Sequence, residues 1–308
     1  MSRYVIGVDG GGTRTGAVLL EVDAGDPERA KELARTEGRS AVADATEPGR
    51  AASAVADACR DVARLAEVDL PVDVVWAGLA GAGREAARSA VELELGRTGV
   101  ARVARVGTDV LAAFQDAFGD GPGVLLVAGT GSIAWGRAED GREGRVGGWG
   151  HHIGDEGSGY AIGVEALRRV ARDADGRGPA TNLRTVILAH LDLEVADDLV
   201  PWFSTVPRAQ VAALAPLVAA AASEGDAAAR EILDHAVEEL ERHVLAVLEN
   251  LGPWERTPTV ALAGGLLRPG RTVRSSLEAA LARDRVRLLE RELDPAMGAG
   301  RLACAVAT

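Results

Sequence analysis

The sequence predicts an α/β protein made of two similar domains, and three observations lead to this prediction. An apolar run at residues 4–8 ends in Asp9 and three glycines, and a second apolar run starts at Gly16, which is typical of a β-hairpin. The same order of apolar run, Gly/Thr turn and apolar run recurs at residues 124–137. Such a repeat indicates two domains built on one plan. Stretches with apolar residues at helical spacing follow both hairpins.

Composition and charge exclude several classes of protein. The chain has 308 residues, enough for one large domain or two ordinary ones, and its net charge of −12 argues against a general nucleic-acid binder. Cys59 and Cys304 lie far apart, so a disulfide framework or a zinc site is not expected. The start of the chain shows no signal peptide, and no apolar segment is long enough to cross a bilayer. We therefore expect a soluble, cytoplasmic protein with no membrane or nucleic-acid partner.

The first half alternates strands and helices. After the hairpin, we expect an edge strand at 33–37, a helix at 47–65, a strand at 72–79, a helix at 84–97, a strand at 101–106 and a helix at 110–118. The glycine-rich segment 119–123 is the strongest loop signal. It predicts an N-terminal domain at 1–119 and a C-terminal domain at 120–294.

The second half is expected to be richer in helices. The hairpin at 124–137 is followed by residues 147–159, which are too rich in glycine for a regular element. We then expect helices at 160–171, 180–191, 210–222 and 226–250, a strand at 260–266, a helix at 273–283 and a short strand at 286–289. A last helix, 295–308, is predicted to pack on the N-terminal domain.

The first glycine turn has the chemistry of an anion site. Successive backbone N–H groups of Gly10, Gly11 and Gly12 can form a concave cradle, and Thr13 and Thr15 add hydroxyl donors. A carboxylate beside a phosphate cradle, here Asp9, is explained if Mg²⁺ lies between them. A hairpin with a flexible loop is the alternative. The second copy has Ala128 where the first has Asp9, so only the first copy carries this carboxylate.

A set of motifs gives the whole chain a resemblance to a known family. The motifs are Val8-Asp9-Gly10-Gly11-Gly12-Thr13, Thr108-Asp109, Gly129-Thr130-Gly131-Ser132, Ala263-Gly264-Gly265 and, most specifically, Gly147-Gly148-Trp149-Gly150-His151-His152-Ile153-Gly154-Asp155-Glu156-Gly157-Ser158. The chain resembles the N-acetylglucosamine kinase group of the BadF/BadG/BcrA/BcrD ATPase family. This resemblance implies the actin/hexokinase/Hsp70-type plan: two duplicated ribonuclease-H-like (actin-like ATPase) domains with ATP in the cleft between them.

The resemblance also implies roles in nucleotide binding. Gly11, Gly12 and Thr13 would hold the β- and γ-phosphates, and Gly129 and Thr130 would do so from the other domain. Gly264 and Gly265 would let adenosine lie against the backbone, and Ala212 matches a position that lines the nucleotide. Asp9 would hold Mg²⁺ through water.

For the acceptor side, Asp109 is the residue expected to act as general base. Phosphoryl transfer to an alcohol needs a carboxylate that orients the hydroxyl and takes its proton. Its position before a helix also fits a simple N-cap. The resemblance assigns sugar contacts to Gly148, Trp149 and Asp155, with ordinary packing and helix N-terminal charge as the alternatives. The adjacent His151 and His152 are interpreted as structural.

The implied function is an ATP-dependent amino-sugar kinase that transfers the γ-phosphate to the 6-hydroxyl of N-acetylglucosamine or a close relative. The loop at 38–45 has Val42 where relatives usually carry an Asn that contacts the sugar, and Asp44 nearby could meet a free 2-ammonium. Glucosamine and N-acetylmuramic acid are therefore alternative acceptors. An activator-type ATPase of the same family would need clustered cysteines, and a sugar-sensing regulator would need a DNA-binding segment. Relatives are often dimers, so we expect a homodimer.

Overall fold

The computed structural model describes residues 3–12, 14–23 and 26–307, without the side chains of residues 26–29. The chain divides into unit 1, formed by residues 1–121 and 291–308, and unit 2, formed by residues 122–290. The boundaries predicted from the sequence, at residues 119 and 294, lie close to the two points where the chain passes from one unit to the other.

Unit 1 is built on a five-stranded mixed sheet in the order β3-β2-β1-β4-β5. Its strands are β1 (Arg3–Gly10), β2 (Arg14–Asp23), β3 (Asp26–Arg39), β4 (Val72–Leu79) and β5 (Ala101–Thr108). The first three strands are antiparallel neighbours, whereas β4 runs parallel to both β1 and β5. Parallel neighbours need crossover connections, and α1 (Pro48–Leu65) and α2 (Glu85–Arg97) provide them.

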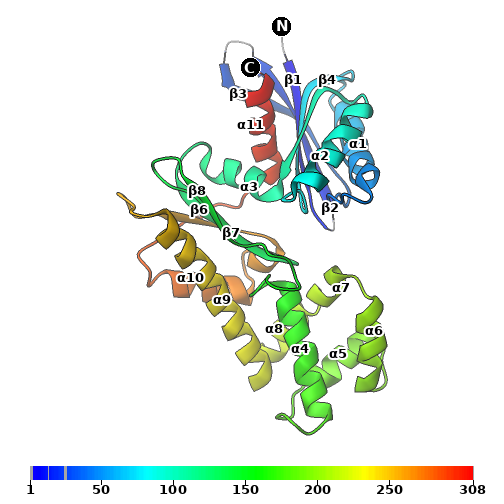
Figure 1. The fold of residues 1–308 in the computed structure, drawn as a ribbon, viewed down its shortest axis with the longest axis vertical. Helices are drawn as coiled ribbons and strands as arrows, with labels where there is room; N and C mark the ends of the chain where they lie inside the picture. Colours follow the sequence, from blue (N-terminus) through cyan, green and yellow to red (C-terminus); the bar gives the residue numbers. More distant parts are fainter. Residues whose placement is uncertain (1–2, 13, 24–25, 308) are drawn as a thin grey trace. The chain divides into compact units, whose positions relative to one another are not determined.

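Helices cover both faces of this sheet. Ile6 and Val8 pack with buried residues of α1 and α2, whereas Val5 packs with residues of α11 (Pro295–Ala307) on the opposite face. This division follows from the alternation of side chains along a strand. The second face also carries α3 (Asp109–Phe118), and α11, drawn in red in Figure 1, runs beside the sheet.

Glycines let α11 lie close to its neighbours. A Cβ at Gly7 would lie 2.1 Å from the backbone N of Gly300, and a Cβ at Gly298 would lie 2.0 Å from the carbonyl O of Ala112. The buried Asp116 of α3 fixes the same returning segment, because its Oδ2 accepts hydrogen bonds from Arg291 Nη1 at 2.6 Å and from the Asp294 N–H at 2.9 Å. The last helix therefore completes unit 1.

Unit 2 repeats the topology of unit 1. Its sheet has the order β10-β9-β6-β7-β8. The strands are β6 (Gly123–Ala128), β7 (Ser132–Arg137), β8 (Glu143–Gly147), β9 (Thr259–Ala263) and β10 (Arg287–Leu288). As in unit 1, a hairpin and a third antiparallel strand are followed by two parallel strands. The predicted duplicated α/β fold is confirmed.

The region between β8 and β9 makes unit 2 rich in helices. Its helices are α4 (Gly159–Ala174), α5 (Leu183–Leu191), α6 (Leu199–Thr205), α7 (Arg208–Ala212), α8 (Ala215–Ser223) and α9 (Ala227–Leu251), with α10 (Thr272–Leu281) after β9. Short 3₁₀ segments lie at Ala196–Asp198 and Gly265–Leu267. Buried residues of these helices and of the sheet form one core. In the described part of the chain, no helix combines the length and hydrophobicity that crossing a bilayer requires.

Four elements differ from the sequence-based prediction. The edge strand β3 begins at residue 26, not 33, because it pairs with β2 over nearly its full length. The helix expected at 210–222 is two helices, α7 and α8, and Pro216 lies in the first turn of α8, where proline is tolerated. The strand β8 and the helix α6 had no predicted counterpart.

Candidate active site

Two carboxylates lie at one edge of the unit 1 sheet. Asp9 in β1 pairs with Gly78 in β4, which pairs with Gly107 in β5, and Asp109 follows two residues later. The carboxyl ends of these parallel strands therefore carry Asp9 and Asp109 on either side of β4. Open α/β sheets bind ligands at this edge.

Asp109 is the first residue of α3, but it does not cap the helix. The N-cap is Thr108, whose Oγ1 accepts a hydrogen bond from the Leu111 N–H at 3.1 Å. The interpretation of Asp109 as an N-cap is therefore wrong. Burial raises the pKa of Asp109, and a hydrogen bond from the Val110 N–H to its Oδ1 at 3.0 Å opposes this increase. A carboxylate of raised pKa is a better proton acceptor than an ordinary aspartate.

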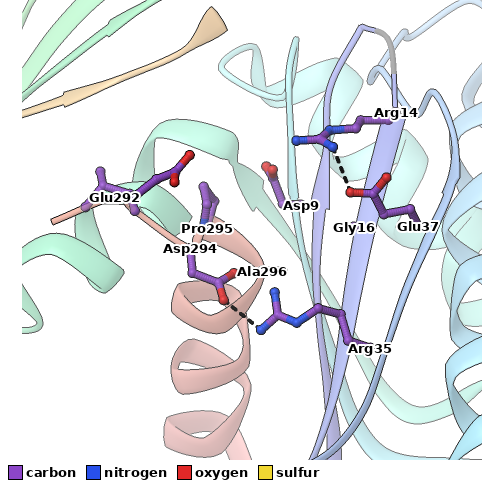
Figure 2. Close-up of a pocket in the computed structure, with 10 residues that line it drawn as sticks. Asp9, Arg14, Gly16, Arg35, Glu37, Glu292, Asp294, Pro295 and Ala296 are labelled. Carbon is purple, nitrogen blue, oxygen red and sulfur yellow. Dashed lines mark hydrogen bonds and ion pairs between the residues drawn. The ribbon is translucent and has the colours of Figure 1, made fainter. Parts of the chain in front are cut away.

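Asp9 lies in a pocket of about 380 Å³ within unit 1. Burial raises its pKa to about 7; the nearby Asp109 and Asp294 carboxylates add to the increase, and the Arg14 guanidinium opposes it. Figure 2 shows the Asp9 carboxylate between the first residues of α11 and the Arg14 side chain. The lining residues are Asp9, Arg14, Gly16, Arg35, Glu37, Glu292, Leu293, Asp294, Pro295 and Ala296.

The glycine turn beside Asp9 is closed by a hydrogen bond from the Gly11 N–H to the Arg14 carbonyl O at 3.0 Å. A Cβ at Gly10 would lie 2.5 Å from Leu79 Cδ2, whereas nothing lies within 4 Å of a Cβ at Gly12. Neither glycine has a left-handed backbone conformation. Gly10 is therefore needed because its neighbours leave no room for a Cβ, whereas the space beside Gly12 is open.

Thr13 and Thr15 of this hairpin were both predicted to offer a hydroxyl donor at the turn. Thr13 lies outside the described residues. Thr15 is completely buried, and the expectation that it offers a hydroxyl at the turn is wrong.

The loop that follows β3 lies against this turn. Ser40 Oγ donates a hydrogen bond to the Gly11 carbonyl O at 2.9 Å, and Val42 forms an isolated bridge with Ala80 after β4. The Val42 side chain is 40% exposed. Asp44 Oδ1 accepts hydrogen bonds from the N–H and Oγ1 of Thr46, and these bonds lower the pKa of Asp44. Asp44 is therefore an ionised, exposed carboxylate near the turn before α1.

In unit 2, the backbone of the second Gly/Thr turn packs against the Asp155 carboxylate. The Gly129 N–H donates to the Gly131 carbonyl O at 2.9 Å, which closes the turn. A Cβ at Gly131 would lie 2.9 Å from Asp155 Oδ1, and the Ser132 N–H points to the same oxygen at 3.4 Å. Asp155 is only 5% exposed, and burial raises its pKa. This carboxylate therefore packs beneath the turn that carries Gly129 and Thr130.

The other residues predicted to contact the nucleotide gather around the same turn. A Cβ at Gly264, which has φ of +96°, would lie 2.2 Å from the Ala128 carbonyl O, so glycine is required there. A Cβ at Gly129 would lie 3.8 Å from the N of Gly265. A Cβ at Gly159 would lie 3.3 Å from the Cβ of Ala212. Unit 2 thus brings Gly129, Ala212, Gly264 and Gly265 to one place.

The first backbone N–H groups of α4 donate hydrogen bonds to other atoms of unit 2. The N–H groups of Gly159 and Tyr160 donate to the carbonyl oxygens of Gly129 and Thr130 at 2.8 and 3.3 Å, and the Ala161 N–H donates to Ser158 Oγ at 3.2 Å. A free helix N-terminus attracts anions. Here these donors fix the turn instead, so they are not free to bind an anion.

The residues predicted to contact the sugar lie on the loop before α4. Gly148 has φ of +69° and packs on Ile133. Trp149 is 62% exposed, and the Arg145 guanidinium lies 4.9 Å from the centre of its ring. The alternative of Trp149 as an ordinary packing residue does not agree with this exposure. A tryptophan ring exposed on a glycine-rich loop is suited to contact a sugar ring.

Sequence reasoning missed Arg14 and Arg208. Arg208, at the start of α7, has its Nη1 3.3 Å from His151 Nδ1 and 4.0 Å from Asp155 Oδ2. The ring of His151 also contacts that of His152, with centroids 3.8 Å apart and the two planes tilted by 38°. An arginine 53 or more residues from its partners gives no local signal in the sequence. Arg14, by contrast, directly follows the glycine turn.

The acidic groups of unit 1 fit a magnesium ion. Mg²⁺ keeps several waters and binds one or two carboxylates together with substrate phosphates. Among the described residues, no group of three or more His, Cys, Asp or Glu side chains is arranged to hold a metal ion. Burial is the main cause of the raised pKa of Asp9, and a divalent cation beside the carboxylate would favour its ionised form.

The two cysteines are both buried in unit 1. Cys59, in α1, packs in the core on one face of the sheet, and Cys304, in α11, packs in the core on the other face. Burial raises the pKa of Cys59 to about 12. Neither thiol is placed to ligate an iron–sulfur cluster at a subunit surface.

Comparisons with known proteins identify the family of the chain. The model of the BadF/BadG/BcrA/BcrD ATPase family matches residues 6–303. An N-acetylmuramic acid/N-acetylglucosamine kinase of Clostridium acetobutylicum is 32% identical over 275 residues, 86% of each chain. An N-acetyl-D-glucosamine kinase of Dictyostelium discoideum is 31% identical over 98% of each chain. The crystal structure of a candidate N-acetylglucosamine kinase from Chromobacterium violaceum superposes with a TM-score of 0.80, at 28% identity, over 98% of this chain and 99% of that one.

Proposed function

The chain belongs to the BadF/BadG/BcrA/BcrD ATPase family, and we propose from this premise that it is an ATP-dependent amino-sugar kinase. It transfers the γ-phosphate of ATP to the 6-hydroxyl of N-acetylglucosamine or a close relative. Relatives named as amino-sugar kinases match most of the chain. The observation that carries the proposal is the pair of Asp9 and Asp109 at one strand edge of unit 1.

Asp109 is the proposed general base. Its fixed position at the start of α3 and its raised pKa suit a group that orients an alcohol and accepts its proton. The bond between the γ-phosphorus and the bridging oxygen breaks as the bond to the sugar oxygen forms, and ADP leaves. A carboxylate in this role contributes about 10²- to 10⁴-fold to the rate.

The nucleotide is proposed to contact residues of both units. Gly11, Gly12 and Thr13 from unit 1 and Gly129 and Thr130 from unit 2 would hold the phosphates, and Ala212, Gly264 and Gly265 would contact adenosine. Asp9 is the proposed magnesium-side residue. When bound, Mg²⁺ would neutralise charge on the phosphate oxygens.

Gly148, Trp149 and Asp155 are the proposed sugar contacts. The identity of the sugar depends on the loop at 40–44, where Val42 offers no hydrogen bond to an acetamido group. Asp44 is exposed and keeps its charge, and it would favour a free 2-ammonium. Glucosamine is therefore the alternative acceptor that a specific observation supports. N-acetylmuramic acid is a second alternative, because the Clostridium relative is named for it.

Other features of the protein stay predictions. The buried cysteines disfavour the activator-type ATPases. The homodimer and the cytoplasmic location rest on the resemblance and on the composition alone.

A screen of ATP consumption tests the function. The acceptors are N-acetylglucosamine, glucosamine, N-acetylmuramic acid, N-acetylmannosamine and glucose, at matched concentrations and with Mg²⁺ present. The position of the product phosphate is determined by NMR. We expect an amino sugar to give the highest kcat/KM and phosphate on its 6-oxygen. Turnover with none of the five would contradict the proposal.

Two variants assign the acceptor preference to the loop. Val42→Asn should increase kcat/KM for N-acetylglucosamine relative to glucosamine, because the amide offers hydrogen bonds to the acetamido group. Asp44→Asn should decrease kcat/KM for glucosamine alone. If activity with glucosamine is no greater than with N-acetylglucosamine in the wild type, the proposed role of Asp44 is wrong.

A further inference from the structure

Arg14 shares the pocket of Asp9 and directly follows the glycine turn. Its carbonyl O accepts the hydrogen bond from the Gly11 N–H that closes the turn. Its side chain lines the same pocket of about 380 Å³ as the Asp9 carboxylate. In Figure 2, the end of the guanidinium away from Glu37 points to the space above Asp9. Arg14 thus presents a positive charge where the turn and the metal-side carboxylate meet.

Glu37 of β3 holds this guanidinium. Arg14 Nη1 lies 2.7 Å from Glu37 Oε1, and the side chains are 58% and 65% exposed. An ion pair this exposed contributes little to folding, with a typical value of about 0–1 kcal/mol. Its main effect is to fix the direction of the guanidinium over the pocket.

Arg35, the other arginine of the pocket, is placed differently. Its Nη2 lies 3.0 Å from Glu32 Oε2 and 2.7 Å from Asp294 Oδ2. Two carboxylates therefore compensate its charge, and it connects β3 to the start of α11. Among the described residues, Glu37 is the one carboxylate in ion-pair contact with Arg14.

The charge of the pocket makes a cation necessary for phosphate binding. The pocket carries four carboxylates, from Asp9, Glu37, Glu292 and Asp294, against two guanidinium groups. A phosphate group would be repelled there unless positive charge faced it. A guanidinium has five N–H donors in a planar fork that matches phosphate oxygens. During phosphoryl transfer, negative charge spreads over three equatorial oxygens, and an arginine at this place stabilises it.

We propose that Arg14 binds the phosphoryl group while it is transferred, and that Glu37 positions Arg14 for this contact. The inference rests on the proposed kinase function. In this step the γ-phosphorus separates from the bridging oxygen of ADP and bonds to the sugar oxygen, whose proton passes to Asp109. Arg14 keeps its own protons and supplies hydrogen bonds to the phosphoryl oxygens.

Four variants test the inference: Arg14→Ala, Arg14→Lys, Glu37→Gln and Arg39→Ala. Arg39 is the matched control, because it lies opposite Arg14 on β3 and forms a comparable exposed ion pair, with Asp57 at 2.8 Å. For each variant we would measure kcat, the Kd for MgADP, and the Kd for MgADP with aluminium fluoride and the sugar, a mimic of the transferred group. Thermal unfolding would identify variants that do not fold.

Arg14→Ala should lower kcat by about 100-fold or more, with the MgADP Kd within about 3-fold of the wild type. Binding of the aluminium fluoride complex should weaken in parallel with kcat, and added guanidinium chloride at low millimolar concentration should restore part of the rate. Arg14→Lys should retain more activity than Arg14→Ala, Glu37→Gln should lose less than Arg14→Ala, and Arg39→Ala should match the wild type.

Two failures can be told apart. A folded Arg14→Ala enzyme that keeps kcat and aluminium fluoride binding within 3-fold of the wild type overturns the inference and leaves the kinase function intact. A wild-type enzyme that phosphorylates no sugar overturns the proposed function itself.

Discussion

The carboxylate of Asp155 lies directly against the backbone of Gly131, where a Cβ would be 2.9 Å from Oδ1 and 3.0 Å from Oδ2. Asp155 is a proposed sugar contact, whereas Gly131 belongs to the turn proposed to hold phosphate. The loop proposed to contact the sugar and the turn proposed to hold phosphate are therefore in direct contact in unit 2. A change at either residue should affect both substrates.

Gly131→Ala should test this contact. The new Cβ would displace the Asp155 carboxylate or the turn, so we expect KM to increase about 10-fold for both ATP and the sugar, with a loss of stability of about 1–3 kcal/mol. Gly83→Ala is the control, since nothing lies within 4 Å of a Cβ there. An increase in KM for only one substrate would show that the two elements act independently.

Asp109→Asn should lower kcat by about 10³-fold while the Kd for ATP stays within a few-fold. In the wild type, the base must be ionised, so the rate falls as pH decreases through its pKa. Because burial raises that pKa, this fall should occur at higher pH than for an ordinary aspartate. The pH profile of kcat checks the direction. A variant with more than a tenth of the wild-type rate would contradict the role as base.

Asp9→Asn should stabilise the metal-free protein at neutral and higher pH. The pKa of Asp9 is about 7 in the folded protein, above its value in the unfolded chain, so the folded state binds this proton more tightly. The stability from Asp9 is thus fully present below about pH 4 and is lost as pH rises through about 7. We expect the variant to exceed the wild type by about 1–3 kcal/mol at pH 8 in EDTA and to match it near pH 4.5.

Urea unfolding at several pH values measures this difference. A constant difference between the two proteins from pH 4.5 to pH 8 would show that the effect does not come from the titration of Asp9. The same variant should lose the stabilisation that Mg²⁺ and ATP give to the wild type.

Gly298→Ala should remove much of the stability of unit 1. A Cβ there would lie 2.0 Å from the Ala112 carbonyl O, so α11 could not keep its place on α3. We expect a loss of about 3 kcal/mol or more, as for overpacked cores. Gly96→Ala, in α2 with open space around it, should instead be neutral or stabilising by up to about 1 kcal/mol. Equal Tm values for the two variants would be inconsistent with the close contact.

The strands β1 and β4 were predictable because each is a largely buried apolar run that contains glycine near its end, whereas β5 is only partly buried and was predicted from its Val residues and the Gly107-Thr108 that end it. The repeat of the first hairpin at residues 124–137 predicted the duplicated topology, which the two sheets confirm. The strand β8 was missed because Glu143–Gly147 contains charged residues and glycines and lies at the sheet edge. The break before α8 was missed because Pro216 fits the first turn of a helix as well as a loop.

Residues of the candidate site were predictable from the sequence only where neighbouring residues in the chain indicate their position. Asp9 and Asp109 each directly follow or end a strand, and a strand end is visible in the sequence. The pairing of Asp155 with Gly131 and of Arg208 with His151 depends on segments distant in the chain, which periodicity does not reveal. The alternative interpretation of Asp109 as an N-cap was one residue away from the actual cap, Thr108, because Thr and Asp are both good caps.

Because α11 packs on β1 and α3, unit 1 cannot finish folding until the last segment of the chain has been synthesised. During synthesis, the first 121 residues leave the ribosome with one sheet face uncovered, and the whole of unit 2 must be made before α11 emerges. The Asp294 carboxylate beside Asp9 arrives with that same last segment. A chain that stops before residue 291 therefore exposes apolar strands and lacks part of the Asp9 pocket, so the proposed active site forms only in chains that include α11.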